Sequence, residues 1–322
     1  MTEEITGQDL VEWQLRVASG EKLPLKQEEL AIQGHALEAR LYAENTEAGF
    51  LPSIGRLDIL SLGYERIESA IEEGDEISPF YDPMIAKIVV HRDTREEAVL
   101  ALRDATGEIE AYPVKTNAGF LTRCLNDEDF RSGRVDTGLI ERRGVALTAT
   151  PKPSDHAQQG AARAFIRAAT RASAPWVAAE GFRLNAPASR QVRMRWRDGT
   201  ITANPLDSAN EITGFDRLGA PGVVLVPENG EMYEFTLDTG ERSEGEAAAG
   251  DGAILSPMPG KIVSVAAKAG AKLKKGDPIL VLEAMKMEHT LTAPFDGKLT
   301  ELNAKPGAQV SEGVLLAKLE KE

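Results

Sequence analysis

The sequence of 322 residues contains a single cysteine, Cys124. One cysteine cannot form an intramolecular disulfide, and it cannot supply the set of cysteine ligands found in structural zinc sites. The four histidines show none of the spacings of metal-ligand motifs: His35, His91, His156 and His289. We therefore expect neither a disulfide framework nor a metal site, and a reducing compartment fits this cysteine usage.

Long apolar runs and positive charge are also scarce. The longest apolar runs, such as Val223–Val226, cover a few residues, whereas a helix needs about 20 to cross a bilayer. Met1 is followed by Thr-Glu-Glu, so no secretory signal or transit peptide is visible. The 37 Lys and Arg stand against 51 Asp and Glu, a formal charge of −14. We expect a cytoplasmic protein, or a mitochondrial matrix protein in a eukaryote, that binds neither nucleic acid nor membrane.

The chain divides into three blocks. Its hydrophobic fraction of 42% is sufficient for packed cores, and its length predicts two or three domains. Two stretches, 147–160 and 239–252, are poor in large apolar residues and rich in Pro, Gly, Ser, Ala or charge, so we interpret them as linkers. They separate residues 1–146, residues 161–238 and residues 253–322.

The N-terminal block mixes helical and strand patterns. Thr6 with Asp9 resembles a capping box, residues 10–17 carry apolar side chains at helical spacing, and Gly20 predicts the end of this helix. Residues 94–97 have the sequence of a capping box and predict a second helix, and Pro113 predicts the start of a third. Residues 36–43 and 85–90 have the composition of strands. This block is therefore predicted to be an α+β domain.

The middle block is predicted to be one helix followed by a small antiparallel β-barrel or sandwich. Residues 161–172 have a helical pattern, and apolar and cationic side chains alternate over residues 192–197, as in a strand. Asp198-Gly199 and Asn229-Gly230 are typical of two-residue hairpin turns. The helix places three arginines on one face, which is either a contact surface or a solvated face: Arg163, Arg167 and Arg171.

The C-terminal block repeats itself after 37 residues, the interval between Gly260 and Gly297. Each copy is too short to bury its own apolar face, so the repeat predicts two half-sheets packed together with quasi-twofold symmetry. The matched positions include prolines, glycines and lysines: Pro257 with Pro294, Lys261 with Lys298, Gly270 with Gly307, and Gly276 with Gly313.

A lysine between two methionines connects the halves of this repeat. Lys286 lies within Ala284-Met285-Lys286-Met287-Glu288, which the symmetry places at a turn at one end of the sandwich. Most single lysines are simply solvated surface residues. Two large apolar side chains beside a lysine at a turn are costly to expose, and methionine is favoured where a partner recognises a surface. The pattern therefore predicts a recognition site around Lys286.

Residues 283–287 resemble the biotin attachment motif of biotinyl carrier domains. The resemblance implies an all-β barrel-sandwich of the biotinyl/lipoyl type, with biotin joined covalently to Lys286 by a biotin protein ligase. It assigns Glu283, Ala284, Met285 and Met287 to the recognition motif. The related lipoyl domains share the fold but typically carry Asp-Lys-Ala at the turn, so a lipoyl carrier is the less favoured alternative.

The N-terminal block is similar to the C-terminal domain of biotin carboxylase. The resemblance implies that Arg66, in the stretch Gly63-Tyr-Glu-Arg-Ile-Glu-Ser69, contacts bicarbonate and the ureido group of biotin; this stretch has one residue more between Gly and Arg than the family pattern. We interpret His35 and Glu38 as structural, because residues three apart on a strand face opposite sides. The matching stretches are residues 6–14, 34–40, 50–53 and 81–87.

The ATP-binding part of that family has no counterpart in this sequence. In the family, ATP-grasp domains with a glycine-rich phosphate loop and metal-binding glutamates precede the region matched here. No G-x-x-x-x-G-K-[ST] run occurs in the 322 residues. We expect ATP and Mg²⁺ to bind only to a full-length subunit, and this chain, as a C-terminal fragment with the ATP-grasp region missing, to be inactive alone in biotin carboxylation.

The middle block resembles the domain through which α subunits of acyl-CoA carboxylases contact a carboxyltransferase β subunit. Its compact length and residues 176–185 are most similar to 3-methylcrotonyl-CoA carboxylase, a biotin-dependent ligase of leucine degradation. Propionyl-, geranyl- and acetyl-CoA carboxylases are the alternatives. The resemblance implies that biotin on Lys286 carries CO₂ from the carboxylase site to the β subunit. A truncated, inactive scaffold that only occupies the β subunit is a further alternative.

Overall fold

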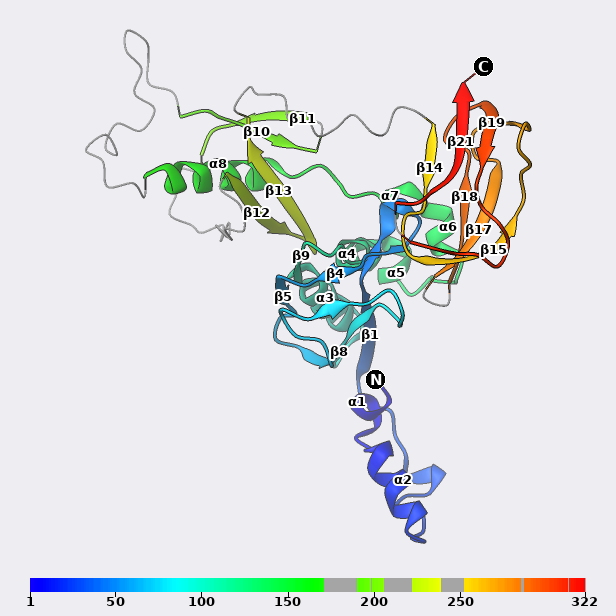
Figure 1. Cartoon of the computed structure of the whole chain (residues 1–322). Helices are drawn as coiled ribbons and strands as arrows, with labels where there is room; N and C mark the ends of the chain where they lie inside the picture. The colour runs from blue at the N-terminus through cyan, green and yellow to red at the C-terminus, as the bar shows by residue number, and fades with distance from the viewer. Residues whose placement is uncertain are drawn as a thin grey trace.

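The computed structural model describes residues 1–170, 190–197, 199–205, 222–238, 252–284, 287–311 and 313–321. These residues form three packed units that follow the three blocks of the sequence (Figure 1). Each unit has its own cluster of buried apolar side chains. The predicted linker at residues 239–252 lies outside the described residues except for Gly252.

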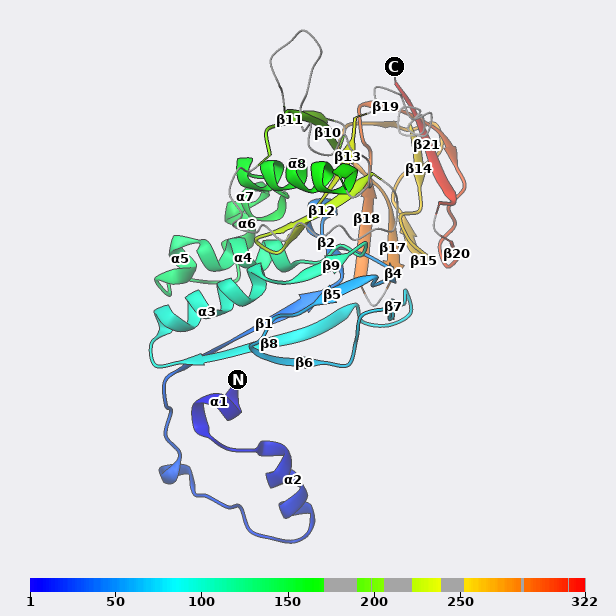
Figure 2. The same cartoon turned by 90° about the vertical axis from the view of Figure 1, so that its left-hand side faces the viewer.

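The chain begins with two helices that project from the rest of the N-terminal unit, α1 (Thr2–Thr6) and α2 (Leu10–Ala18) (Figures 1 and 2). Asp9 caps α2, because its carboxylate accepts hydrogen bonds from the backbone N–H groups of Val11 and Glu12 at 3.0 and 2.9 Å. No residue of α2 is buried. The predicted helix is thus present, but the predicted capping box is wrong: Asp9 is the cap, and Thr6 ends α1.

A three-stranded antiparallel sheet and one helix form the core of the N-terminal unit. The strands β1 (His35–Tyr42), β8 (Met84–Arg92) and β6 (Arg66–Ser69) lie in the order β1-β8-β6, and α3 (Arg95–Gly107) packs on β8 and β1. Thr94 and Glu97 form the predicted capping box: each side chain accepts a hydrogen bond from the other residue's backbone N–H, at 3.2 and 3.1 Å. Both predicted strands are confirmed.

The third predicted helix corresponds to α4 (Ala118–Asn126), which starts five residues after Pro113, where the sequence predicted its beginning. The reason is tertiary. Strand β9 (Glu110–Tyr112) pairs with β5 (Ile59–Ser61) up to Tyr112, and Lys115 N–H then donates to Ser53 Oγ at 2.9 Å, which holds this loop out of a helix. The shorter elements are η1 (Gln27–Glu29), β2 (Glu44–Asn45), η2 (Thr46–Ala48), β3 (Leu51–Pro52), β4 (Gly55–Arg56), β7 (Glu76–Ile77), α5 (Glu128–Arg131), α6 (Leu139–Arg143) and α7 (Val145–Thr148).

The middle unit is a helix on an antiparallel sheet. Helix α8 (Asp155–Thr170) packs on four strands in the order β11-β10-β13-β12. Within the described residues the edge strands are not paired with each other, so the sheet is open and the predicted closed barrel is not seen. The bounds of the strands are β10 (Val192–Trp196), β11 (Gly199–Ala203), β12 (Val223–Glu228) and β13 (Glu231–Leu237).

Helix α8 begins within the stretch that composition predicted to be a linker. Its first turns are anchored by small apolar side chains, since Ala157 is 1% exposed and Ala161 is fully buried. Alanine carries too little apolar surface to reveal a buried face by composition alone, which explains the misplaced start. Arg163 and Arg167 lie on the exposed side of α8, whereas Arg171 and residues 176–185 lie outside the described residues.

Both hairpins of the middle unit are present. Asn229 and Gly230 connect β12 and β13 as predicted, with positive φ angles of 53° and 76°. In the other hairpin Trp196 pairs with Gly199, so the connecting residues are Arg197 and Asp198, one position earlier than predicted. Asp198 itself lies outside the described residues.

The C-terminal unit is a sandwich of two four-stranded antiparallel sheets, in the orders β14-β21-β19-β16 and β18-β17-β15-β20. The 37-residue repeat relates β15 to β19, β16 to β20 and β17 to β21, residue for residue. This confirms the predicted quasi-symmetric sandwich. The strands are β14 (Ala253–Leu255), β15 (Gly260–Val265), β16 (Lys272–Leu273), β17 (Pro278–Ala284), β18 (Met287–Thr292), β19 (Gly297–Leu302), β20 (Gln309–Val310) and β21 (Leu315–Lys321).

We expect Gly297→Ala to lower the free energy of unfolding of the C-terminal unit by about 1–3 kcal/mol, because a Cβ there would overlap the carbonyl oxygen of Glu320. The repeat places Gly260 equivalently, with a Cβ 2.7 Å from the carbonyl oxygen of Glu283. Urea unfolding of the chain measures the effect. Gly199→Ala is the matched control, since its nearest neighbour would lie at an ordinary 3.6 Å; equal losses in both variants would contradict the close-approach argument.

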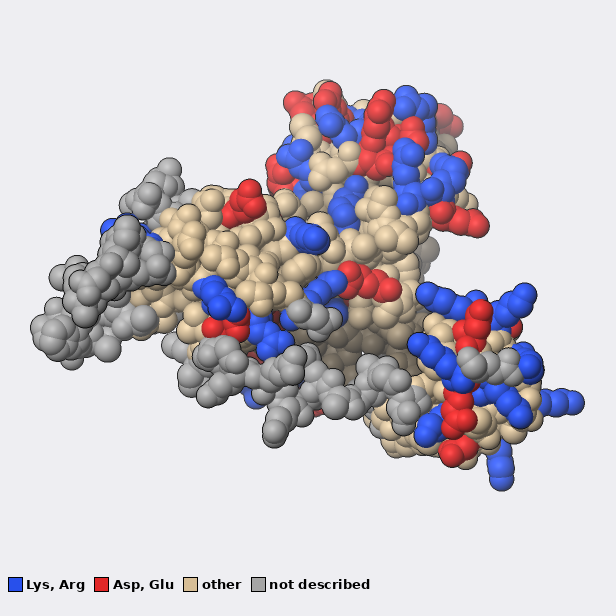
Figure 3. All heavy atoms as spheres, turned by 90° about the horizontal axis from the view of Figure 1, so that it is seen from above, with Lys and Arg blue, Asp and Glu red and all other residues tan. Residues whose placement is uncertain are grey.

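No helix in the described ranges is both long and apolar enough to span a membrane. On the face drawn in Figure 3, acidic and basic side chains lie interspersed.

Candidate functional site

The residues around Lys286 lie at the end of a paired hairpin in the C-terminal unit. Strands β17 and β18 pair antiparallel through Leu282 with His289 and up to Ala284 with Met287. The two residues that connect the strands are Met285 and Lys286, which lie outside the described residues, as does the side chain of Met287. The attachment site predicted at Lys286 therefore stays a prediction, now placed by chain connectivity at the end of this ladder.

The described members of the predicted recognition motif have different environments. Ala284 is 5% exposed and belongs to the core of the sandwich, next to the fully buried Leu282. Glu283 between them is exposed. This alternation is that of a strand with one face on the core. Ala284 thus anchors the strand end, and of the two described motif side chains Glu283 is the one available to a partner.

His289 is a buried polar residue that sequence reasoning considered only as a metal ligand and dismissed. It is 8% exposed on β18, opposite Leu282, and its Nε2 has no hydrogen-bond partner within the described residues. Burial lowers the pKa of His289 below its ordinary value of 6.5, because the apolar surroundings disfavour the charged imidazolium. The ring therefore lies in the carrier core in its neutral form.

This gives a pH-dependent stability. Below pH 6.5 His289 binds a proton in the unfolded chain but not yet in the folded chain. Proton binding therefore stabilises the unfolded state, and the free energy of unfolding falls as the pH drops below 6.5. The loss is at most about 1.4 kcal/mol per unit of difference between the two pKa values. We expect His289→Leu to remove this contribution, measured by urea unfolding at pH 7.5 and 5.5. His156→Gln, at an exposed histidine, is the control. An unchanged pH dependence in His289→Leu would refute the assignment.

Arg66, the predicted bicarbonate and biotin contact, starts strand β6 and is held by three carboxylates. Its Nη2 donates to Glu3 and Glu68 at 2.6 Å each, and its Nη1 donates to Glu4 at 2.6 Å. These hydrogen bonds raise the pKa of Arg66 further, and Arg66 in turn lowers the pKa of Glu4. The side chain is 40% exposed. Arg66 is therefore a permanent cation with a fixed orientation. An incoming anion has to compete with Glu3 and Glu4 of α1 for the N–H donors of its guanidinium.

His35 and Glu38 do not form an acid–base pair. His35 is an exposed residue at the start of β1, and Glu38 lies 3.5 Å from Arg40 on the same strand. This agrees with their interpretation as structural residues.

A cavity of about 470 Å³ lies between the N-terminal and middle units, and no sequence pattern singled it out. Glu44 lines it at 8% exposure, beside Lys115 and Trp196 among others. Burial, assisted by the charge of Asp82, raises the pKa of Glu44 to about 7. The side chains at the junction between the two units therefore leave part of its volume unfilled.

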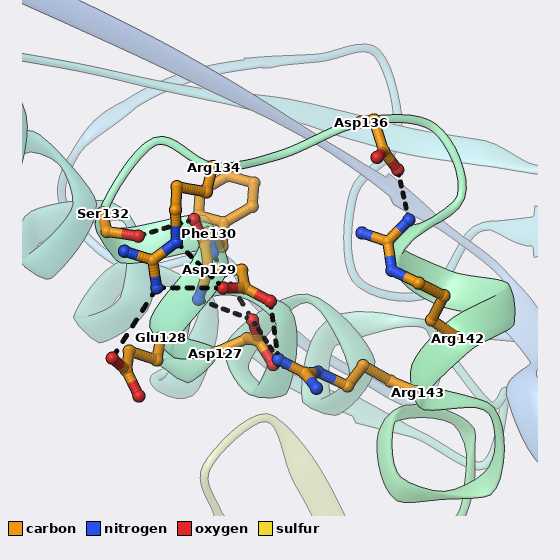
Figure 4. A network of polar contacts seen from close by, with 9 residues as sticks. All are labelled: Asp127, Glu128, Asp129, Phe130, Ser132, Arg134, Asp136, Arg142 and Arg143. Carbon is orange, nitrogen blue, oxygen red and sulfur yellow. Dashed lines mark hydrogen bonds and ion pairs between the residues drawn. The ribbon is translucent and has the colours of Figure 1, made fainter.

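The largest set of paired charges described here lies on α5 and α6 (Figure 4). Asp127 caps α5 and binds Arg143 at 2.7 Å, which lowers the pKa of Asp127, and Asp129 binds Arg143 and Arg134 at 2.8 and 3.0 Å. Every arginine in this network is matched by a carboxylate, and the Arg143 pairs with Asp127 and Asp129 connect α6 to α5. No group of His, Cys, Asp or Glu within the described residues could hold a metal ion.

Two protein families match separate units of the chain. The family described as "Biotin carboxylase C-terminal domain" matches residues 38–142, and the one described as "Biotin-requiring enzyme" matches residues 252–319. These ranges fall within the N-terminal unit and the sandwich. The fold and these matches define the class: the chain combines the C-terminal domain of a biotin carboxylase with a biotin/lipoyl-type carrier domain.

Similar proteins of known name indicate which biotin-dependent enzymes this chain resembles. The chain is 35% identical, over 90% of its length and 49% of the relative's, to "Methylcrotonoyl-CoA carboxylase subunit alpha, mitochondrial" of Dictyostelium discoideum. It is 46% identical to "Biotin carboxylase" of Halalkalibacterium halodurans, over 44% of the chain and 31% of that protein. It is 31% identical to "Propionyl-CoA carboxylase alpha chain, mitochondrial" of Caenorhabditis briggsae, over 91% of the chain and 48% of that protein.

The chain contains a biotin carboxylase C-terminal domain and a biotin/lipoyl-type domain, as the resemblance in its sequence implied. Over about nine-tenths of its length it is similar to the methylcrotonoyl-CoA carboxylase α subunits. The chain spans about half the length of the curated relatives it matches.

Proposed function

We propose that this chain carries biotin on Lys286 and delivers CO₂ on that biotin to the carboxyltransferase of a β subunit. The observation that carries the proposal is the Met-Lys-Met sequence at the connection of β17 and β18, in a domain matched by a biotin-requiring family. A side chain and cofactor held on a folded domain replace free diffusion by a high effective concentration. A biotin protein ligase would supply the attachment.

Arg66 would serve the carboxylation half of the reaction. Its fixed guanidinium can orient bicarbonate and stabilise the negative charge that develops on the ureido oxygen of biotin. Glu68, which accepts hydrogen bonds from Nε and Nη2 of Arg66 at 3.1 and 2.6 Å, would hold the guanidinium in its plane. ATP and Mg²⁺ would bind to the part of the full-length subunit that this sequence does not contain, so this chain alone would not carboxylate biotin.

The acyl-CoA proposed as acceptor is 3-methylcrotonyl-CoA, an intermediate of leucine degradation. The similarity to methylcrotonoyl-CoA carboxylase α subunits supports it, and the more distant similarity to a propionyl-CoA carboxylase α chain keeps that substrate as the alternative. Because the acceptor site would lie on the β subunit, the test is carboxylation of a panel of acyl-CoA thioesters by the α/β complex. We propose a cytoplasmic location, or the mitochondrial matrix in a eukaryote.

The attached group distinguishes the proposal from a lipoyl carrier. Intact mass spectrometry of the chain, coexpressed with a biotin protein ligase, is expected to show one biotin per chain. A lipoyl adduct, or an unmodified chain, would count against the proposal. The scaffold alternative is tested by a pull-down with the β subunit of a relative, together with the mass measurement. A pure scaffold would bind the β subunit without carrying biotin.

A further inference from the structure

The hairpin of β12 and β13 in the middle unit inserts its tip against two helices of the carboxylase domain. The backbone N–H of Gly230, at the tip, donates to the carbonyl oxygen of Gly107 at the end of α3, at 2.9 Å. This is a direct backbone contact between residues more than 100 positions apart. It links the sheet to the carboxylase domain at a defined point.

The fit at the tip is close enough to require glycine. A Cβ on Gly230 would lie 2.8 Å from the carbonyl oxygen of Thr106, and equally close to backbone atoms of Ala118 and Gly119. Real Cβ atoms do not approach backbone atoms to that distance. The positive φ of Gly230, 76°, also favours glycine. The end of α3 and the start of α4 thus form a cleft shaped for a glycine-tipped turn.

Polar contacts fix the hairpin on either side of the tip. Glu231 binds Arg123 of α4 at 2.7 Å, and the two side chains are only 17% and 18% exposed. Arg123 Nε also donates to the carbonyl oxygen of Leu147 at 2.7 Å, which orients its guanidinium. Charges this buried are rarely left without partners, so separation of the hairpin from α4 would expose an unpaired cation and an unpaired carboxylate.

Two further contacts lie away from the tip. Tyr112 on β9 donates its hydroxyl proton to Glu234 on β13 at 2.9 Å, and Arg197 after β10 binds Glu47 of η2 at 2.7 Å. The carboxylase domain is therefore contacted at the tip, along β13 and just after β10. Together these contacts oppose rotation of the sheet as well as its withdrawal from the carboxylase domain.

We propose that the α3–α4 cleft is a permanent docking site for the β12–β13 hairpin, so that the carboxylase domain and the middle sheet move as one rigid body. As a consequence, which rests on the proposed function, the movement that brings biotin from one site to the other takes place between this body and the carrier domain. The docking itself can be tested without biotin, ATP or a β subunit.

A disulfide across the cleft tests the docking in the full chain. A Cβ at Gly107 would lie 3.8 Å from the Cα of Asn229, within the reach of a disulfide. We expect the Gly107→Cys/Asn229→Cys variant to cross-link in oxidised glutathione on the order of ten times faster than Gly133→Cys/Asn229→Cys. Burial raises the pKa of the native Cys124 thiol to about 11, so it reacts slowly. Equal rates for the two pairs would overturn the proposal.

Glycine variants test the same site by another measurement. Hydrogen exchange of the α4 amides is expected to accelerate on the order of tenfold in Gly230→Val and not in Gly222→Ala. Gly222 lies beside β12 with a similar positive φ of 88°, but nothing lies within 4 Å of its Cβ position. If Gly230→Val unfolds the sheet, Glu231→Gln is the milder substitution to use. We expect it to accelerate the hydrogen exchange of the α4 amides as well. Unchanged α4 exchange in a folded Glu231→Gln or Gly230→Val chain would refute permanent docking. Biotin on Lys286 is unaffected in either case.

Discussion

A Lys286→Arg variant is expected to carry no biotin, whereas the wild-type chain coexpressed with a biotin protein ligase is labelled. Attachment requires a neutral amine that attacks the carboxyl carbon of activated biotin; the amide forms as the bond to the activating group breaks, and the nitrogen loses a proton. An arginine guanidinium remains protonated at all accessible pH values and offers no such nucleophile, although it keeps the positive charge. The loss is therefore expected to be complete and not partial. Streptavidin blotting and intact mass of the same sample measure it.

Lys298→Arg is the matched control for this variant. Lys298 is an exposed lysine of the same sandwich, on β19, and it lacks the flanking methionines. Its substitution is expected to leave the streptavidin signal unchanged. Equal labelling of the wild type and Lys286→Arg would remove the assignment of the attachment site. Loss of labelling in Lys298→Arg as well would point to misfolding of the sandwich.

The second large effect is expected at Arg66. The purified chain is expected to show no bicarbonate-dependent ATP hydrolysis, because its sequence contains no G-x-x-x-x-G-K-[ST] run and no counterpart of the family's ATP-grasp region was recognised in it. Fusion to the ATP-binding region of a relative is expected to restore it. In that fusion Arg66→Ala should lower the rate of biotin carboxylation by about 10²–10³-fold, the usual effect of removing one group that stabilises developing charge.

Arg56→Ala is the control for this experiment. Arg56 is 70% exposed at the end of β4 and lies 3.4 Å from Asp58, so its removal should leave the rate unchanged. A fusion in which Arg66→Ala retains the full rate would exclude Arg66 from the reaction. Measurable bicarbonate-dependent ATP hydrolysis by the unfused chain would refute the argument from the missing phosphate-binding run.

Local sequence determined the elements whose signals are short-range. The Thr94–Glu97 capping box requires four consecutive residues, and the Asn229-Gly230 turn requires two that tolerate positive φ. The sandwich was also predictable, because its 37-residue repeat sets the order of its strands. Even the register irregularity between Ile262 and Ser264 recurs between Leu299 and Glu301.

Errors arose where a boundary depends on distant partners. The start of α4 was misplaced because pairing of β9 with β5 extends to Tyr112. The start of α8 was misplaced because its buried face is made of alanines, such as Ala157, that carry little hydrophobic signal. The middle block was expected to be a barrel or a sandwich, and among its described strands the two edges do not pair; strand composition says nothing about whether two edges meet.

The sequence by itself therefore determined the three blocks of this protein, the carrier sandwich and the lysine on which its proposed chemistry depends. Only the tertiary structure decided what surrounds the other residues. It brought Glu3 and Glu4 to Arg66 and placed Gly230 in the cleft between α3 and α4. The physical reason is range: caps, turns and repeats are specified by neighbouring or regularly spaced residues, whereas ion pairs and docking surfaces are specified by the path of the whole chain.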